Sequence, residues 1–150
     1  MKAKVKRKPV YIENRKAKFD YQFLEVLTAG IILQGSEVKS IRDGRVNLMD
    51  SFCYFEQDAL WTKNLELTPT VEHYAHEPKR PRKLLLKKKE LLALAKNMVQ
   101  GTTIVIMAIE EVRGRFKVKI ALARGKKNYD KRETLKERDA AREIKNVNNL

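Results

Sequence analysis

The chain has 150 residues, of which 33 are Lys or Arg and 19 are Asp or Glu, so its formal net charge is +14. Its length suits one domain. Its charge exceeds the magnitude of about 2 to 8 that solubility requires. This excess favours a nucleic acid partner, because each phosphate that the protein neutralises releases a counterion. We expect no membrane partner, since no stretch approaches the roughly 18 apolar residues of a spanning helix and no signal-peptide core follows the basic N-terminus.

Apolar periodicity divides the chain into three parts. Residues 1–12 form a basic arm with no hydrophobic face to bury, and we expect it to be flexible. Residues 13–123 carry the periodicity of a folded RNA-binding body. Residues 124–150 are again polar and basic and form a C-terminal tail.

The first part of the body predicts a strand followed by a short helix. Phe19–Leu27 alternates apolar and polar residues, Gly30 is expected to break the strand, and Ile31–Leu33 resumes it. Ser36 is the expected N-cap of a helix from Glu37 to about Asp43. Gly44 is its expected stop.

The middle of the body predicts a hairpin, a short strand and a longer helix. Phe52–Phe55 and Leu60–Leu67 are the two hairpin strands, and Cys53, the single cysteine, is expected to be a buried hydrophobe. Without a possible internal disulfide, the chain suits a reducing cytoplasm. Arg82–Leu86 predicts a strand, and Lys87–Val99 a helix that ends before Gly101. The apolar face expected for this helix consists of Leu91, Leu94, Ala95 and Met98.

The last part of the body predicts a second hairpin. Thr102–Ile109 and Phe116–Ala123 flank the turn pair Arg113-Gly114. About six short strands with two helices predict a mainly β fold, namely an OB-like closed barrel with two appended helices.

The tail is rich in good helix formers but poor in apolar anchors. A helix of this length is marginal in water without a partner. We therefore expect residues 124–150 to be disordered alone and helical on binding a partner.

The sequence offers no constellation for catalysis. His73 and His76 lie in a polar loop, and no further Cys or His completes a metal-ligand set. A phosphate-cradling glycine loop and a nucleophile motif are also lacking. We expect no enzyme, no metal and no cofactor.

Basic segments are the stronger functional candidates. The loop Lys79–Lys83 is either solvated or contacts phosphates, and the pattern leaves both open. The segment Arg124–Lys127 joins body and tail, and its glycine allows a close approach to a partner. Phe19 and Tyr21 are rings that stack on exposed bases or fill the core, with one of them expected in the core.

Motifs along nearly the whole chain, from about 12 to 145, resemble the SmpB family of SsrA-binding proteins. Their order and spacing make the resemblance specific. The motifs are Asn14–Ala17 with Asp20 and Tyr21, Ala29–Ile31, Gly35–Gly44, Asn47 with Leu48, Asp50–Phe52, Arg82–Leu86, Lys117–Ile120, Gly125–Lys127 and Tyr129–Glu133. The chain departs from the family pattern at Thr28, where many members have Glu, and at Tyr129, where some have His.

This resemblance implies binding to the tRNA-like domain of tmRNA and its delivery, with elongation factor Tu, to stalled ribosomes, where the tail probes the empty decoding centre and mRNA channel. It implies a monomer in a 1:1 complex with aminoacylated tmRNA. The implied tmRNA-binding residues are Asn14, Arg15, Lys16, Phe19, Lys83, Leu85, Lys117 and Gly125. The implied ribosome-binding tail residues are Lys126, Lys127, Tyr129, Asp130, Lys131, Arg132, Lys136 and Arg138. The alternatives are a basic ribosomal protein and, less favoured, a nuclease or RNA-modifying enzyme.

Overall fold

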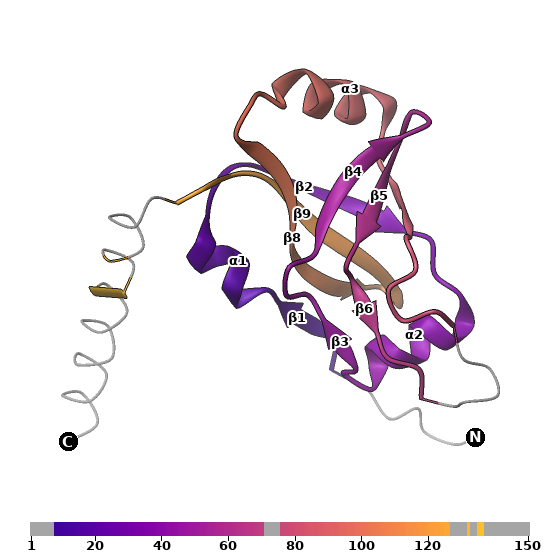
Figure 1. The fold of residues 1–150 in the computed structure, drawn as a ribbon. Coiled ribbons are helices and arrows are strands. Elements are labelled where there is room, and N and C mark those ends of the chain that lie inside the picture. The colour runs from indigo at the N-terminus through magenta and orange to yellow at the C-terminus, as the bar shows by residue number, and fades with distance from the viewer. Residues whose placement is uncertain (1–7, 71–75, 127–131, 133–134, 137–150) are drawn as a thin grey trace, which may run out of the picture.

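A computed structural model describes residues 8–70, 76–126, 132 and 135–136 (Figure 1). The fold is mainly β, as predicted, and the described part contains three helices rather than two. The helices are α1 (Arg15–Asp20), α2 (Gly35–Arg42) and α3 (Lys88–Asn97). The strands are β1 (Tyr11–Glu13), β2 (Tyr21–Ile31), β3 (Val46–Asn47), β4 (Phe52–Glu56), β5 (Ala59–Lys63), β6 (Glu66–Leu67), β7 (Lys83–Leu85), β8 (Thr102–Val112) and β9 (Arg115–Gly125).

The main sheet has seven strands in the order β1-β8-β4-β5-β7-β2-β9. Because β8 also pairs with β9, hydrogen bonding runs from β8 through β4, β5, β7, β2 and β9 and returns to β8. All these pairings are antiparallel. A second sheet contains β3 and β6. Figure 1 shows α3 over one end of the ring of strands and α2 near the other.

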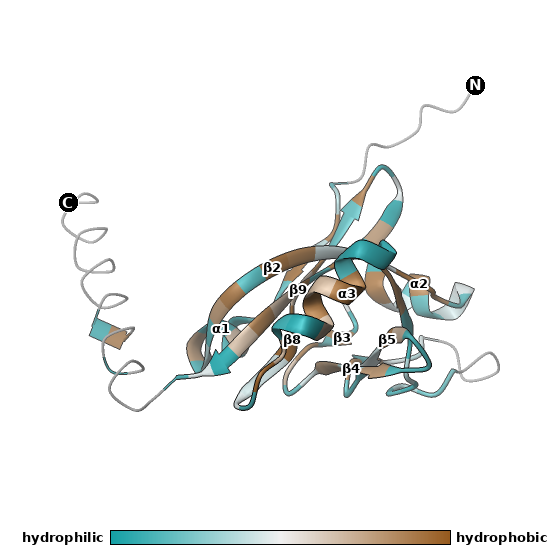
Figure 2. Cartoon of the chain, turned by 90° about the horizontal axis from the view of Figure 1, so that it is seen from above, coloured by the Kyte–Doolittle hydropathy of each residue, from teal (hydrophilic) through white to brown (hydrophobic). Residues whose placement is uncertain are grey.

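The core lies inside this ring and is built by alternation along the long strands. In β8 and β9, Ile104, Ile106, Val118 and Ile120 are at most 1% exposed, while residues between them point to the other face of the sheet. A smaller cluster under α1 contains Ala17, Val105, Ala121 and Ala123. Figure 2 shows the resulting bands of apolar and polar residues on the strands.

Two tight turns fix the register of the hairpins. Arg113 and Gly114 have φ values of 52° and 78°, the left-handed pair that two-residue hairpins need, as predicted. Gln57 and Asp58 repeat this conformation with φ values of 49° and 58°. The prediction of one strand over Leu60–Leu67 is wrong, because β5 ends at Lys63 and β6 pairs with β3 in the second sheet.

The N-terminal region differs most from the prediction. The expected strand at Phe19 begins only at Tyr21, because Arg15–Asp20 form α1; six residues are too few to show helical periodicity. Gly30 does not break β2, which continues to Ile31. Tyr11–Glu13 form β1 against β8, so the sheet includes two residues assigned to the arm.

Helix α2 begins two residues earlier than predicted, with Gln34 rather than Ser36 as its N-cap. The Gln34 backbone N–H donates to the Glu37 carboxylate at 2.8 Å. Gly44 follows the helix with a φ of 72° and is the predicted stop. Helix α3 matches its predicted position, although Ala95 is exposed and Leu94 is its buried residue.

A buried ion pair ties α2 to β7. Glu37 and Arg82 are both 0% exposed and are joined through Arg82 Nε. Arg82 Nη1 also donates to the Leu65 carbonyl at 2.8 Å, and Arg80 Nη2 reaches the other Glu37 oxygen at 2.5 Å. Burial, the largest influence, raises the pKa of Glu37, but hydrogen bonds from the Gln34 amide and the two guanidinium groups outweigh it and hold that pKa below its ordinary value.

We predict that Glu37→Ala lowers the free energy of unfolding by about 3 to 5 kcal/mol, because it leaves the Arg82 charge buried without its partner. The ionised carboxylate contributes its full share to the free energy of unfolding above its unfolded pKa of about 4.3, and this share is lost as pH falls through the lower folded pKa. The difference in stability between the parent chain and Glu37→Ala should therefore become smaller in acid. Urea unfolding of the parent chain and of the variant at several pH values measures this difference in the free energy of unfolding. Glu56→Ala, at an exposed position, is the control; an equal loss in both variants would contradict the prediction.

We predict that Cys53 is inert to alkylation in the folded protein. Its side chain is 3% exposed, as expected from the sequence, and burial raises the pKa of its thiol, so the reactive thiolate is scarce. Mass spectrometry after iodoacetamide treatment should find modification in urea and none without it. Rapid alkylation of the native protein would contradict the packing of β4.

Candidate nucleic-acid interface

The first candidate surface is the β7-β2-β9 patch, defined by Lys83, Leu85, Gly30 and Lys117. Gly30 of β2 lies opposite Leu85 of β7 on one side and opposite Lys117 of β9 on the other. Residues opposite each other in neighbouring strands share a face of the sheet. Lys83 points to the same side as Leu85, since the two are separated by one residue. Two predicted RNA-binding residues of β7 therefore lie beside a third, Lys117, from a distant part of the sequence.

The absence of a side chain at Gly30 shapes this patch. A Cβ atom at Gly30 would lie 3.3 Å from Leu85 Cβ, so a larger residue would push against the leucine. Leu85 is 51% exposed although it is apolar. Leu85, Gly30 and Lys117 line a pocket of about 400 Å³. The patch thus combines an exposed apolar side chain with a cation, a combination that contacts both bases and phosphates.

The cations of this patch are available to a partner. Lys83 and Lys117 are exposed, and none of the ion pairs between described residues includes either. Glu110 lies opposite Lys117 in β8, but its carboxylate is 3.6 Å from Lys119 Nζ.

Asn14, a predicted RNA-binding residue, is placed inside the protein. It is 5% exposed, and its Nδ2 donates to the carbonyls of Leu48 and Ile106, both at 2.9 Å. Its Oδ1 accepts from the backbone N–H of Ala17 at 3.1 Å and caps α1. Both amide hydrogens are used, so the side chain positions α1 and has no donor left for RNA.

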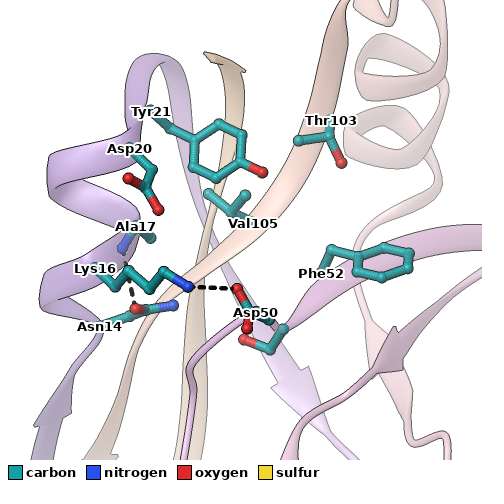
Figure 3. A pocket seen from close by; sticks show the side chains of 10 residues that line it. Asn14, Lys16, Ala17, Asp20, Tyr21, Asp50, Phe52, Thr103 and Val105 are labelled. Carbon is teal, nitrogen blue, oxygen red and sulfur yellow. Dashed lines mark hydrogen bonds and ion pairs between the residues drawn. The ribbon is translucent and has the colours of Figure 1, made fainter. Parts of the chain in front are cut away.

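The second candidate surface is the α1 pocket beside that helix, with a volume of about 360 Å³ (Figure 3). Its lining residues come from α1, β2, β4, β8 and the loop before β4 and are Asn14, Lys16, Ala17, Asp20, Tyr21, Asp50, Ser51, Phe52, Thr103 and Val105. Lys16 Nζ lies 2.9 Å from Asp50 Oδ1, and this hydrogen bond raises the pKa of Lys16. Arg15 is exposed and Phe19 is half-buried in the same helix.

The root of the tail is attached to α1. Gly125 lies opposite Tyr21 at the end of β9. The backbone N–H of Lys126 donates to the Asp20 carbonyl at 2.8 Å, and its Nζ donates to the Lys18 carbonyl at 3.2 Å. Lys126, predicted to bind the ribosome, thus caps the C-terminal turn of α1.

The other predicted tail residues are only partly visible. Arg132 and Lys136 have helical backbone and are exposed. The tail residues that lie outside the described ranges are Lys127, Tyr129, Asp130, Lys131 and Arg138. The expected change from disorder to helix falls mostly on those residues.

Some residues of the basic loop and one of the two histidines have partners inside the protein. In the basic loop, Arg80 and Arg82 bind Glu37, while Lys79 and Lys83 are exposed. His76 is 7% exposed, with one ring nitrogen 2.8 Å from Ser36 Oγ and the other 2.6 Å from the Leu67 carbonyl.

Among the described residues, no three His, Cys, Asp or Glu side chains gather where they would hold a metal ion. None of the described helices has the length and apolar character needed to cross a bilayer.

Sequence reasoning missed Asp50, Phe52 and Gly30 as members of these surfaces. Asp50 and Phe52 lie in a motif shared with the family, but no charge or periodicity pattern distinguishes a surface aromatic residue from a core one. Gly30 was interpreted as a strand breaker, and only its two neighbouring strands reveal the space that it leaves.

Comparisons with known proteins agree with this geometry. The family model described as "SmpB protein" matches residues 11–149. The SsrA-binding protein of Carboxydothermus hydrogenoformans is 49% identical over 138 residues, which cover 90% of this chain and 93% of that protein. The SsrA-binding protein of Phocaeicola vulgatus is 47% identical over 146 residues, covering 93% and 96%.

A solved structure described as "tmRNA-SmpB: a journey to the center of the bacterial ribosome" contains a chain with the same fold. That chain is 46% identical, superposes with a TM-score of 0.68, and the match covers 79% of this chain and 86% of that one. With the family model matching nearly the whole length, this chain belongs to the SmpB family of SsrA-binding proteins.

Proposed function

We propose that this protein binds the tRNA-like domain of tmRNA and delivers it to stalled ribosomes for trans-translation, acting as a binding protein and not as an enzyme. The observation that carries the proposal is the likeness to the tmRNA-SmpB structure at 46% identity and a TM-score of 0.68. The net charge of +14 supports an RNA partner. A cytoplasmic location follows from this role.

The ring of six paired strands supports an OB-like barrel as the RNA-binding body. The β7-β2-β9 patch offers Lys83, Leu85 and Lys117 to tmRNA, and Asn14 acts by holding α1 in place. Arg15, Lys16 and Phe19 of α1 form a second region for RNA beside Gly125. We propose a monomer in a 1:1 complex, with elongation factor Tu bound to the same aminoacylated tmRNA.

The tail acts on the ribosome in this proposal. Residues from Lys126 onward are basic and follow a strand end tied to α1, so the tail leaves the body at a defined point. Inside the decoding centre and the empty mRNA channel, ribosomal RNA would supply the phosphates that the tail lacks when free.

The test is binding of the purified protein to the tRNA-like domain of tmRNA and to an ordinary tRNA of similar size, at near-physiological salt. We expect a clear preference for the tmRNA domain. Equal and steeply salt-dependent binding to both would leave only the charge attraction and would favour a basic ribosomal protein instead.

We predict that Lys117→Glu weakens binding to the tRNA-like domain and reduces the slope of log affinity against log salt by about one, because one phosphate contact is lost. The control is Lys96→Glu, which makes the same charge change at an exposed position of α3. Lys96 lies near the C-terminal end of α3 and lines neither the α1 pocket nor the pocket of the β7-β2-β9 patch. Equal effects of both variants would show that only net charge matters.

We predict that replacing Asp130, Lys131 and Arg132 together with Ala spares tmRNA binding and abolishes tagging of stalled chains. These residues lie in the tail, beyond the body that holds both RNA surfaces. A reconstituted translation system with a truncated mRNA measures tagging, and the binding assay above measures affinity. Parallel loss of binding and tagging would contradict the division between body and tail.

A further inference from the structure

We propose that the α1 pocket receives a single unstacked nucleobase of bound RNA whose edge donates hydrogen bonds, with guanine as the preferred base. This inference rests on the proposed function, because it requires RNA on this face of the protein. It adds a specific subsite, since nothing in the charge of the protein selects one base over another.

The shape of the pocket suits a flat ligand. Thr103 and Val105 of β8 lie between Tyr21, at the start of β2, and Phe52 of β4 (Figure 3). The volume of about 360 Å³ falls within the range of roughly 300 to 1,000 Å³ that is usual for small-molecule sites. A base that enters between the two rings would therefore be flanked by aromatic surface.

Phe52 is not required by the core. It is half-buried and belongs to neither hydrophobic cluster, whereas Phe55 of the same strand packs against the main one. Phe52 lies opposite Val105 in β8, on the outward face. An aromatic ring on the protein surface without a core role is a group on which unstacked bases pack.

Tyr21 supplies the second ring and is held firmly. It packs against the small cluster formed by Ala17, Val105, Ala121 and Ala123, and its backbone pairs with Gly125. Figure 3 shows its ring close to Thr103 and Val105. A ring that is already ordered loses little conformational entropy when a base stacks on it.

The polar rim of the pocket selects the base. Asp50 has a side chain that is 70% exposed, and Lys16 binds its Oδ1 at 2.9 Å. The ion pair orients the carboxylate while leaving acceptor capacity on it, and an ionised carboxylate only accepts hydrogen bonds. The matching base edge must present donors. Guanine offers adjacent N–H and NH2 donors on its Watson–Crick edge, whereas uracil presents mainly carbonyl oxygens.

The first experiment titrates the isotope-labelled full chain with guanosine 5′-monophosphate and with uridine 5′-monophosphate, which share a sugar and a phosphate. We expect saturable shifts of the backbone signals of Phe52, Thr103 and Val105 with the guanine nucleotide, and at least several-fold weaker binding of the uracil nucleotide. Absence of shifts at these residues would overturn the pocket, and equal affinities would overturn the preference for guanine.

The second experiment compares Phe52→Leu with Tyr54→Leu. Both replace an aromatic residue of β4 with the same side chain, but Tyr54 does not line the pocket. We expect Phe52→Leu alone to lower the affinity for RNA on the order of 10-fold, the typical effect of one lost stacking contact. Matching amide spectra of the variants and the parent chain verify that the fold is intact.

Two RNA partners identify the source of the base. If Phe52→Leu lowers the affinity for the isolated tRNA-like domain, the base belongs to tmRNA. If it lowers only the affinity for ribosomal small subunits, the base belongs to ribosomal RNA. If neither affinity falls, the pocket is not an RNA subsite even if it binds the free nucleotide. Failure of the proposed function is separate, because it appears as equal binding of the parent protein to the tmRNA domain and ordinary tRNA.

Discussion

Strand β9 is hydrogen-bonded along both of its edges, to β8 on one side and to β2 on the other, and both candidate surfaces depend on this pairing. Its register with β2 sets Lys117 beside Gly30 at one end and Gly125 beside Tyr21 at the other. The two positions are eight residues apart, which corresponds to roughly 26 Å of extended chain. A register slip of one residue would turn Lys117 toward the core, so the geometry of the proposed RNA-binding face depends on the pairing of these strands.

Buried polar side chains fix the positions of segments that are not hydrogen-bonded into the main sheet. Glu37 and Arg82 join α2 to β7, and Asn14 joins α1 to the Leu48 and Ile106 carbonyls. Such groups are costly to bury unless every partner is present. Their use in the interior explains why Asn14 and Arg82, which resemble surface contacts in the sequence, are buried.

The folded body tolerates the excess positive charge because its cations lie on the surface. Lys83 and Lys117 are exposed on the strands, and the tail carries further cations beyond Lys126. Repulsion between exposed cations is screened by water and salt, while the core stays apolar except for paired groups. The α1 pocket adds aromatic and carboxylate groups to this basic surface, and these distinguish bases where lysine distinguishes only charge.

The mainly β class, the Arg113-Gly114 turn and α3 were predictable from the sequence, and the net charge indicated a nucleic-acid partner, because alternation, turn chemistry and net charge are local or additive properties. The family motifs suggested Leu85 and Lys117 as RNA-binding residues, without indicating that they lie close together. Tertiary structure decided the rest. The short helix α1 exists because Asn14 caps it and the sheet packs beneath it, Gly30 stays in its strand because Leu85 covers it, and Asn14 lies inside. The cap itself is local, but the burial of Asn14 and the Gly30–Leu85 contact depend on residues more than 30 positions away, and no local pattern reports such contacts.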